Sequence, residues 1–247
     1  MRERCLCSVK YNEPIAKDIF KLVIETSVNL QQIPGQFINI KIDNFYLRRP
    51  FSICDCLEKS IIIVYKVVGR GTKRLSETTR AQQLDIICGL GNGFDMDALS
   101  DKSEVVLIGG GMGAAPLYFL AKSLKESGVS FETVLGFTDS KQAFFLDEFS
   151  RFSAIHVSSL DGKIGTKGLV TDSLRDISYN YYFSCGPLPM LKSVHRFKAA
   201  PGQLLLEERM GCGFGACMSC SFKTINKSKR ICVDGPVIYS SEVDFSE

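Results

Sequence analysis

The sequence predicts an α/β plus β protein made of an N-terminal antiparallel β-barrel, a parallel-sheet α/β unit and a small C-terminal segment. Three observations lead to this prediction. Short β-branched runs fill residues 1–100, strands and helices alternate over 101–200, and cysteine and glycine gather in 201–247. We expect these ranges to be the domains, and 247 residues suffice for two hydrophobic cores.

The barrel is expected from five strand-like runs separated by turn residues. They read CSVKY, IFKLVIET, QFINIKI, IIIVYKVV and LDIICGL. Their alternation of apolar and polar residues is typical of strands with one buried face. The motif RRPFSI lies between two of these strands, and the later Gly-Thr pair places Thr72 as the N-cap of a short helix.

The α/β unit is expected from a buried strand, EVVLIGG, and the amphipathic helix APLYFLAKSLKESG that follows it. Leu117, Leu120 and Leu124 share one face of this helix, and Gly128 ends it. Later runs continue the alternation up to the strand YYFSCGP and the helix PMLKSVHRF. This order predicts a parallel sheet covered by helices.

Composition excludes some classes of partner. The formal net charge is only +3, with 30 basic residues spread among 27 acidic ones, so neither nucleic acid nor a membrane surface is expected. The N-terminus lacks the apolar run of a secretion signal, and VVLIGGGMGAAPLYFLA is too short to span a bilayer. We expect a cytoplasmic protein whose cysteines are reduced, so that a tight cysteine group indicates metal or redox use.

Four of the ten cysteines form such a group, at Cys212, Cys217, Cys220 and Cys232. The spacing C-x4-C-x2-C with a later cysteine is typical of plant-type 2Fe-2S proteins. Neighbouring glycines let the loop fold around a cluster and aim backbone N–H groups at its sulfurs. Zinc remains the alternative, although zinc sites usually pair two C-x2-C units.

A glycine-rich turn follows the first strand of the α/β unit. Gly109, Gly111 and Ala114 form a G-x-G-x-x-A pattern between strand and helix, which favours a nucleotide diphosphate; a tight turn without ligand is the alternative. No acidic residue stands about twenty positions later, so the ordinary dinucleotide fold is not fully supported. Asp139 after the next strand would repel a 2'-phosphate, which favours NADH over NADPH.

Two barrel motifs suit an anionic ligand. Arg49 offers a planar fork for a diphosphate, and Ser52 can reach a phosphate oxygen or ring heteroatom. Gly71 and Thr72 open a helix whose free N–H groups favour an anion. Together they suggest a dinucleotide, while each alone is also compatible with an exposed edge residue or an ordinary turn.

With these motifs the chain resembles the ferredoxin reductase superfamily. The resemblance implies an FAD site in the barrel and a nicotinamide nucleotide site in the α/β unit. The implied FAD residues are Arg49, Pro50, Phe51, Ser52, Tyr65, Lys66, Val67, Gly71 and Thr72. The implied nucleotide residues are Gly109, Gly110, Gly111, Gly113, Cys185, Gly186 and Pro187.

The order nicotinamide, FAD, 2Fe-2S is chemically complete, because a hydride brings two electrons together, a cluster takes them singly, and a flavin does both. No acid–base triad is needed, so we expect no catalytic side chain. Around LLLEERMGCGFGACMSC and ICVDGPV the chain closely resembles the electron transfer subunits of type B dihydroorotate dehydrogenase. The eleven residues between Cys220 and Cys232 look short for that family, which would reshape the loop over the cluster.

That second resemblance implies a role in pyrimidine biosynthesis. NADH, FAD and the cluster would exchange electrons with FMN in a separate catalytic subunit, in a heterotetramer of two plus two chains. One alternative is the subunit of NADH-dependent ferredoxin:NADP oxidoreductase, in which one cysteine ligand is expected to be aspartate, or of sulfide dehydrogenase. A zinc-stabilised interaction module is the non-enzymatic alternative.

Overall fold

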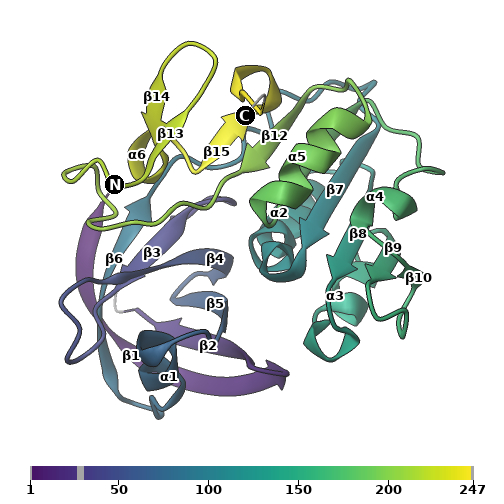
Figure 1. Cartoon of the computed structure of the whole chain (residues 1–247). Coiled ribbons are helices and arrows are strands. Elements are labelled where there is room, and N and C mark those ends of the chain that lie inside the picture. Colours follow the sequence, from purple (N-terminus) through teal and green to yellow (C-terminus); the bar gives the residue numbers. More distant parts are fainter. Residues whose placement is uncertain (1, 27–30, 246–247) are drawn as a thin grey trace.

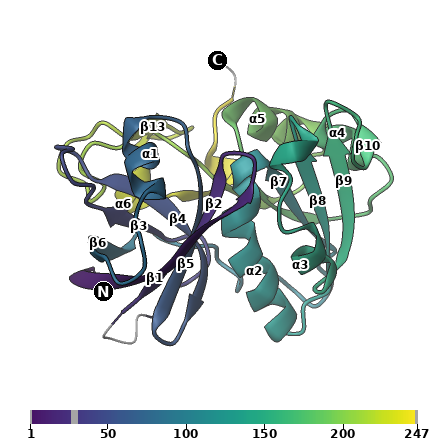
Figure 2. The same cartoon turned by 90° about the horizontal axis from the view of Figure 1, so that it is seen from below.

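The computed structural model describes residues 2–26 and 31–245. Two lobes lie side by side, and the C-terminal segment runs across the top of both (Figure 1). The view from below separates the barrel from the α/β lobe, with α2 (Ala114–Glu126) at their contact (Figure 2). Within the described ranges no helix is long and apolar enough to cross a membrane.

The N-terminal lobe is a closed barrel with strand order β1-β2-β5-β4-β3-β6, and every pairing is antiparallel. This confirms the predicted barrel. Isoleucines from several strands fill its interior, among them Ile38, Ile53 and Ile63, each 0% exposed. The elements are β1 (Glu3–Ala16), β2 (Ile19–Glu25), β3 (Phe37–Ile40), β4 (Arg49–Leu57), β5 (Ser60–Lys66), α1 (Arg70–Ser76) and β6 (Gln83–Leu90).

Two local expectations in the barrel are wrong. The motif that begins at Arg49 does not lie between strands but opens β4, which pairs with β3 and β5. Thr72 is not the N-cap of α1; Gly69 is, and the Thr72 hydroxyl instead accepts hydrogen bonds from the N–H groups of Val68 (2.9 Å) and Gly69 (3.1 Å). Thr72 therefore holds the turn before the helix closed.

The second lobe is a seven-stranded sheet, order β10-β9-β8-β7-β11-β12-β15, parallel except for β15. Helix α2 ends where predicted, with Gly128 at φ +76°. The remaining elements of this lobe are β7 (Val105–Gly110), η1 (Gly111–Gly113), β8 (Phe131–Phe137), η2 (Ser140–Gln142), α3 (Leu146–Ser150), β9 (Ala154–Ser159), β10 (Thr166–Lys167), α4 (Val170–Ser173), β11 (Tyr181–Cys185) and α5 (Leu188–Phe197).

The C-terminal segment is joined to this sheet. Its strands β12 (Gly202–Leu205) and β15 (Val237–Tyr239) extend the sheet beyond β11. Between them lie the loop of three cysteines, the hairpin β13 (Ser221–Lys223) and β14 (Ser228–Arg230), and α6 (Ile231–Asp234); η3 (Ser240–Glu242) follows. The short stretch between Cys220 and Cys232 thus contains a two-stranded hairpin. The segment that carries the four cysteines is anchored to the sheet at both ends, by β12 and β15.

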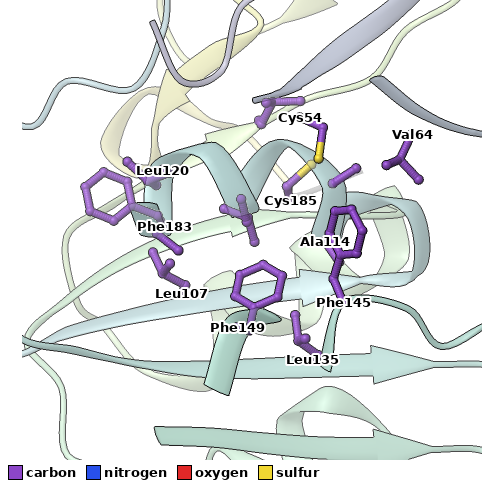
Figure 3. Close-up of a cluster of buried hydrophobic side chains, with 14 of the residues drawn as sticks. Cys54, Val64, Leu107, Ala114, Leu120, Leu135, Phe145, Phe149, Phe183 and Cys185 are labelled. Atoms are coloured by element: carbon purple, nitrogen blue, oxygen red, sulfur yellow. The ribbon is translucent and has the colours of Figure 1, made fainter. Parts of the chain in front are cut away.

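The two lobes share a hydrophobic core. Cys54 of β4 and Val64 of β5 pack in one cluster with Ala114 and Leu120 of α2 (Figure 3). At the rim of this contact Lys122 of α2 donates to Asp55 of β4 at 3.0 Å. Buried apolar contacts and a partly buried ion pair therefore join the two lobes.

Candidate functional site

A cavity of about 340 Å³ lies between the barrel, the start of α2 and the segment after β12. Its lining is predominantly apolar, with Phe37 and Tyr65 on the barrel side and Met112 and Met210 opposite. Such a cavity suits a flat aromatic ligand. Of the residues expected at FAD, it brings together Arg49, Pro50, Phe51, Ser52, Tyr65, Lys66 and Thr72. Val67 and Gly71 do not line it.

Backbone and ring contacts set the direction of Arg49. Its Nη1 donates to the carbonyl of Leu47 at 2.6 Å, and its guanidinium lies 5.3 Å from the Phe45 ring centre. Gly71 contributes by leaving room, because a Cβ there would lie 3.2 Å from Arg49 Nε. Within the described residues no carboxylate pairs with Arg49, so its charge is available to a diphosphate at the cavity mouth.

Tyr65 is held rigidly at the cavity wall. Its hydroxyl donates to Asn12 at 3.0 Å, and its ring stacks on Phe20 with centroids 5.8 Å apart. Burial raises the pKa of Tyr65 to about 12, so it stays neutral at any physiological pH. This wall therefore offers an uncharged aromatic face.

A second cavity, of about 330 Å³, continues from the first towards the α/β lobe. Gly110, Gly111 and Gly113 line it together with Gly186 and Pro187, as expected for a nicotinamide nucleotide. These residues come from the ends of β7 and β11, which are neighbours in the sheet. Lys66, Met112 and Glu207 line both cavities, so ligands in the two would meet there.

Gly113 is required by packing. A Cβ at this position would overlap the carbonyl oxygen of Cys185. The close approach seats the start of α2 against the end of β11. The Cys185 side chain itself is 0% exposed and lies in the shared core, and burial raises its pKa (Figure 3). Neither Cys185 nor Gly109 is among the residues that line the first or the second cavity, so both would support a nucleotide site from behind.

A third cavity, of about 320 Å³, extends over the carboxyl ends of β8 and β9. It shares Gly110, Gly111, Thr138 and Pro187 with the second. The hydroxyl of Ser158 in its lining is buried and has no hydrogen-bond partner among the residues that the structure describes. A nucleotide hydroxyl would satisfy that group, so the donor set fits the remainder of a dinucleotide.

Sequence reasoning missed Glu207. This residue follows β12 and lines the first cavity, called the flavin-sized cavity below, as well as the second cavity and a smaller one of about 140 Å³. Desolvation by the surrounding protein raises the pKa of its carboxyl group. A glutamate in LLLEERMG reads as a surface residue, and the residue is exposed; only the tertiary position of β12 places it beside these cavities.

The four predicted cluster ligands come together as two pairs. The Cys217 sulfur accepts from the Cys212 N–H at 3.3 Å, while Cys220 and Cys232, both buried, interact with each other through their thiols. Cys212 and Cys232 also lie close enough to interact electrostatically, which links the pairs. Two thiols per metal is the donor set that a 2Fe-2S cluster requires.

The loop favours thiolates on its outer side. Donors from Ser219, then from the Cys212 N–H, lower the pKa of Cys217 to about 6. Burial opposes ionisation of Cys212, but the N–H groups of Phe214, Cys217 and Ala216 outweigh it and lower its pKa. In the described ranges no three His, Cys, Asp or Glu side chains are arranged around a single metal ion.

Comparisons with known proteins agree with this geometry. Residues 207–244 match the iron-sulfur cluster binding domain of dihydroorotate dehydrogenase B. The chain is 39% identical over 252 residues to the dihydroorotate dehydrogenase B (NAD(+)) electron transfer subunit of Fusobacterium nucleatum, covering 96% of this chain and 97% of that one. The same subunit of Geobacillus sp. is 40% identical over 248 residues, covering 96% of each.

Solved structures show the same fold. A structure of the NADH-dependent reduced ferredoxin-NADP oxidoreductase superposes with a TM-score of 0.87 at 32% identity, covering 98% of this chain and 91% of that one. Phthalate dioxygenase reductase, at 17% identity, superposes with a TM-score of 0.67, and the match covers 90% of this chain and 87% of the reductase chain. On the near full-length identity to its curated relatives, the chain belongs to the family of dihydroorotate dehydrogenase B (NAD(+)) electron transfer subunits.

Proposed function

We propose that this chain relays electrons between NAD and the catalytic subunit of a dihydroorotate dehydrogenase through FAD and a 2Fe-2S cluster. One observation carries the proposal: the three cavities share residues in series, and the wall of the flavin-sized cavity leads directly to the cluster loop. Met210 lines that cavity and stands two residues before Cys212. Nicotinamide, flavin and cluster sites would therefore be consecutive in space.

The barrel would bind and orient FAD. Arg49 would hold the diphosphate, with Phe37, Phe51 and Tyr65 forming the wall beside the ring. Bound FAD supplies exchange between a two-electron hydride donor and a one-electron carrier. The chain's own contribution is alignment and exclusion of water by the apolar lining. This role would require no side-chain nucleophile.

The second and third cavities would hold NAD. Gly110, Gly111 and Gly113 let the backbone approach the diphosphate, while Gly186 and Pro187 bound the nicotinamide end. Glu207 lines both cavities and would lie where the two ligands meet, and desolvation raises the pKa of its carboxyl group.

The catalytic partner is proposed to be an FMN-containing chain, assembled as two plus two subunits. The name of the relatives, electron transfer subunit, implies a catalytic partner. Apolar side chains stand exposed on the cluster loop itself, with Phe214 at 45% and Met218 at 57%. Cys217 is exposed beside them. This face would be covered in the complex, bringing the cluster near the partner's flavin.

Co-expression with a candidate FMN subunit tests the proposal. The complex should contain FAD, FMN, two irons and two sulfides per pair of chains, and should reduce NAD with dihydroorotate. This chain alone should oxidise NADH with an artificial acceptor but not dihydroorotate. A complex without dihydroorotate activity, or dihydroorotate oxidation by this chain alone, would contradict it.

A second candidate is a subunit of an NADH-dependent ferredoxin-NADP oxidoreductase, because that structure superposes over 98% of the chain. All four expected ligand positions here are cysteine, whereas one aspartate ligand is expected in that enzyme. The two are separated by the same preparation. Reduction of NADP by NADH and reduced ferredoxin, without dihydroorotate activity, would favour the second. The cytoplasmic location stays a prediction.

A further inference from the structure

A buried amide connects the barrel to the cluster loop. Asn39 of β3 is 1% exposed, and its Nδ2 donates to the Cys212 carbonyl at 2.9 Å across 173 positions of sequence. The barrel's other hydrogen bond to this loop, from Arg2 Nη1 to the Phe214 carbonyl at 3.2 Å, is exposed to solvent. Because water competes at the second contact and not at the first, Asn39 is the stronger attachment.

The loop is shaped to receive this amide. Gly213, directly after Cys212, has φ +78°, and a Cβ there would overlap Nδ2 of Asn39. Only glycine combines that backbone angle with that approach. The Oδ1 of Asn39 is buried and has no hydrogen-bond partner in the described part of the chain. An apolar residue of the same size would avoid that cost, so the amide's role lies in its donation to Cys212.

Holding this carbonyl fixes the donors that follow it. The N–H groups of Phe214 and Ala216 donate to the Cys212 sulfur at 3.5 and 3.2 Å. Rotation of the peptide after Cys212 would move both donors away from the sulfur. Hydrogen bonds to ligand sulfurs favour the more negative, reduced cluster and raise its potential.

The same strand also borders the flavin-sized cavity. Phe37, two residues before Asn39 on β3, lines that cavity, and two residues of a strand span about 7 Å. On the other side Met210 lines the cavity and Cys212 receives the amide. The Asn39–Cys212 hydrogen bond therefore links the strand that borders the flavin-sized cavity directly to the cluster loop.

We infer that Asn39 is a positioning residue that fixes the cluster loop against the flavin barrel and raises the reduction potential of the cluster. The inference rests on the proposed function in that the loop must hold a 2Fe-2S cluster. Asn39 acts through the Cys212 peptide and touches no reacting atom. Its loss should weaken the N–H donation to Cys212 while leaving the flavin site intact.

The test is Asn39→Leu, which keeps side-chain volume and removes the amide, measured in the complete chain prepared anaerobically. Thr133→Val is the matched control, because Thr133 is 0% exposed and bonds Ser153 at 2.8 Å within the α/β lobe. Iron, acid-labile sulfide and FAD are counted, and the cluster potential and the paramagnetic resonance spectrum of the reduced cluster are recorded. We expect Asn39→Leu to keep FAD, shift the potential to more negative values and change the spectrum, while Thr133→Val changes neither.

Wild-type potential and spectrum in Asn39→Leu would overturn the inference but leave the proposed function standing. Wild-type protein without iron and sulfide would overturn both. Loss of iron with FAD retained in Asn39→Leu supports the anchoring role. If Asn39→Leu does not fold, Asn39→Ser is measured instead, and the same negative shift supports the inference while its absence overturns it.

A double-mutant cycle tests the contact itself. Gly213→Ala alone places a Cβ against the amide, and Asn39→Ala alone removes the amide. The double variant has no amide for the new Cβ to overlap. Its fold-loss of bound iron should therefore be smaller than the product of the fold-losses of the two single variants. Equality with that product would contradict direct packing of Asn39 on Gly213.

Discussion

Cysteine thiols in the walls of the barrel and on the outer side of the cluster loop have pKa values shifted in opposite directions. In the walls, burial raises the pKa of Cys54 and Cys7. In the cluster loop, backbone and hydroxyl donors lower the pKa of Cys217 to about 6. Burial also raises the pKa of the predicted ligand Cys232 to about 12, so the difference distinguishes the exposed outer ligand Cys217 from buried thiols, whether these are ligands or wall residues.

The largest expected effect separates two cysteines. Cys217→Ala should abolish the cluster, because even partners outside the ligand set change metal affinity by about 10–100-fold and a lost ligand exceeds that. We expect dihydroorotate-linked NAD reduction by the complex to fall more than about 100-fold, with FAD retained. Cys7→Ala should keep its iron and instead lower the free energy of unfolding by about 1 kcal/mol. Loss of iron in Cys7→Ala would break the contrast; iron and sulfide counts decide.

The next largest effect is expected from a comparison of two adjacent arginines, Arg48 and Arg49. Arg49 opens onto the cavity without an acidic partner among the described residues, whereas Arg48 binds Asp85 at 2.8 Å. Arg49→Ala should weaken FAD binding roughly 10–100-fold, since charge-assisted hydrogen bonds contribute about 1.5–3 kcal/mol. Arg48→Ala should lower stability and leave the FAD dissociation constant within a few-fold of wild type. Equal FAD losses in a fluorescence titration would refute the distinction.

The wall carboxylate Asp85 gives the acid dependence of the barrel. Hydrogen bonds from Arg4, and then from Arg48, lower its pKa below 3.8. A depressed folded pKa means that its stabilising effect is complete above the unfolded value and is lost as pH falls through the folded one. Asp85→Asn should therefore destabilise the protein by about 1–3 kcal/mol at pH 7. Its deficit should shrink below about pH 4; a deficit constant from pH 7 to 3 in denaturant titrations would contradict this.

The sequence was most informative where chemistry dictates spacing. The cysteine pattern and the glycine turn before α2 identified residues that the fold gathers in neighbouring positions, because both depend on local backbone geometry. Strand β4 was missed for a physical reason: a register shift between Ile53 and Asp55 interrupts its alternation, and Pro50 argues against a strand. Glu207 and Asn39 were beyond reach, since their roles arise from contacts made only when distant strands meet.

The smallest expected effect concerns loop carboxylates at the outer end of the nucleotide cavities. The Ser140 hydroxyl, at 2.7 Å, and its N–H lower the pKa of Asp161 to about 2, so this group is ionised at physiological pH. Asp139 on the neighbouring loop accepts from the Lys141 N–H at 2.9 Å. Both follow strands whose ends line the third cavity, where they would repel a 2'-phosphate.

Asp161→Asn and Asp139→Asn should each raise kcat/KM for NADPH relative to NADH by a few-fold, because exposed charges are screened by salt. The gain should decrease as ionic strength rises. Asp176→Asn is the control and should change neither constant, because Asp176 precedes β11 and so lies towards the amino ends of the parallel strands, whereas the cavity lies at their carboxyl ends. If instead the first two variants lower the relative use of NADPH, the nearby Lys141 and Lys163 would govern the choice, and loop carboxylates would not set nucleotide preference.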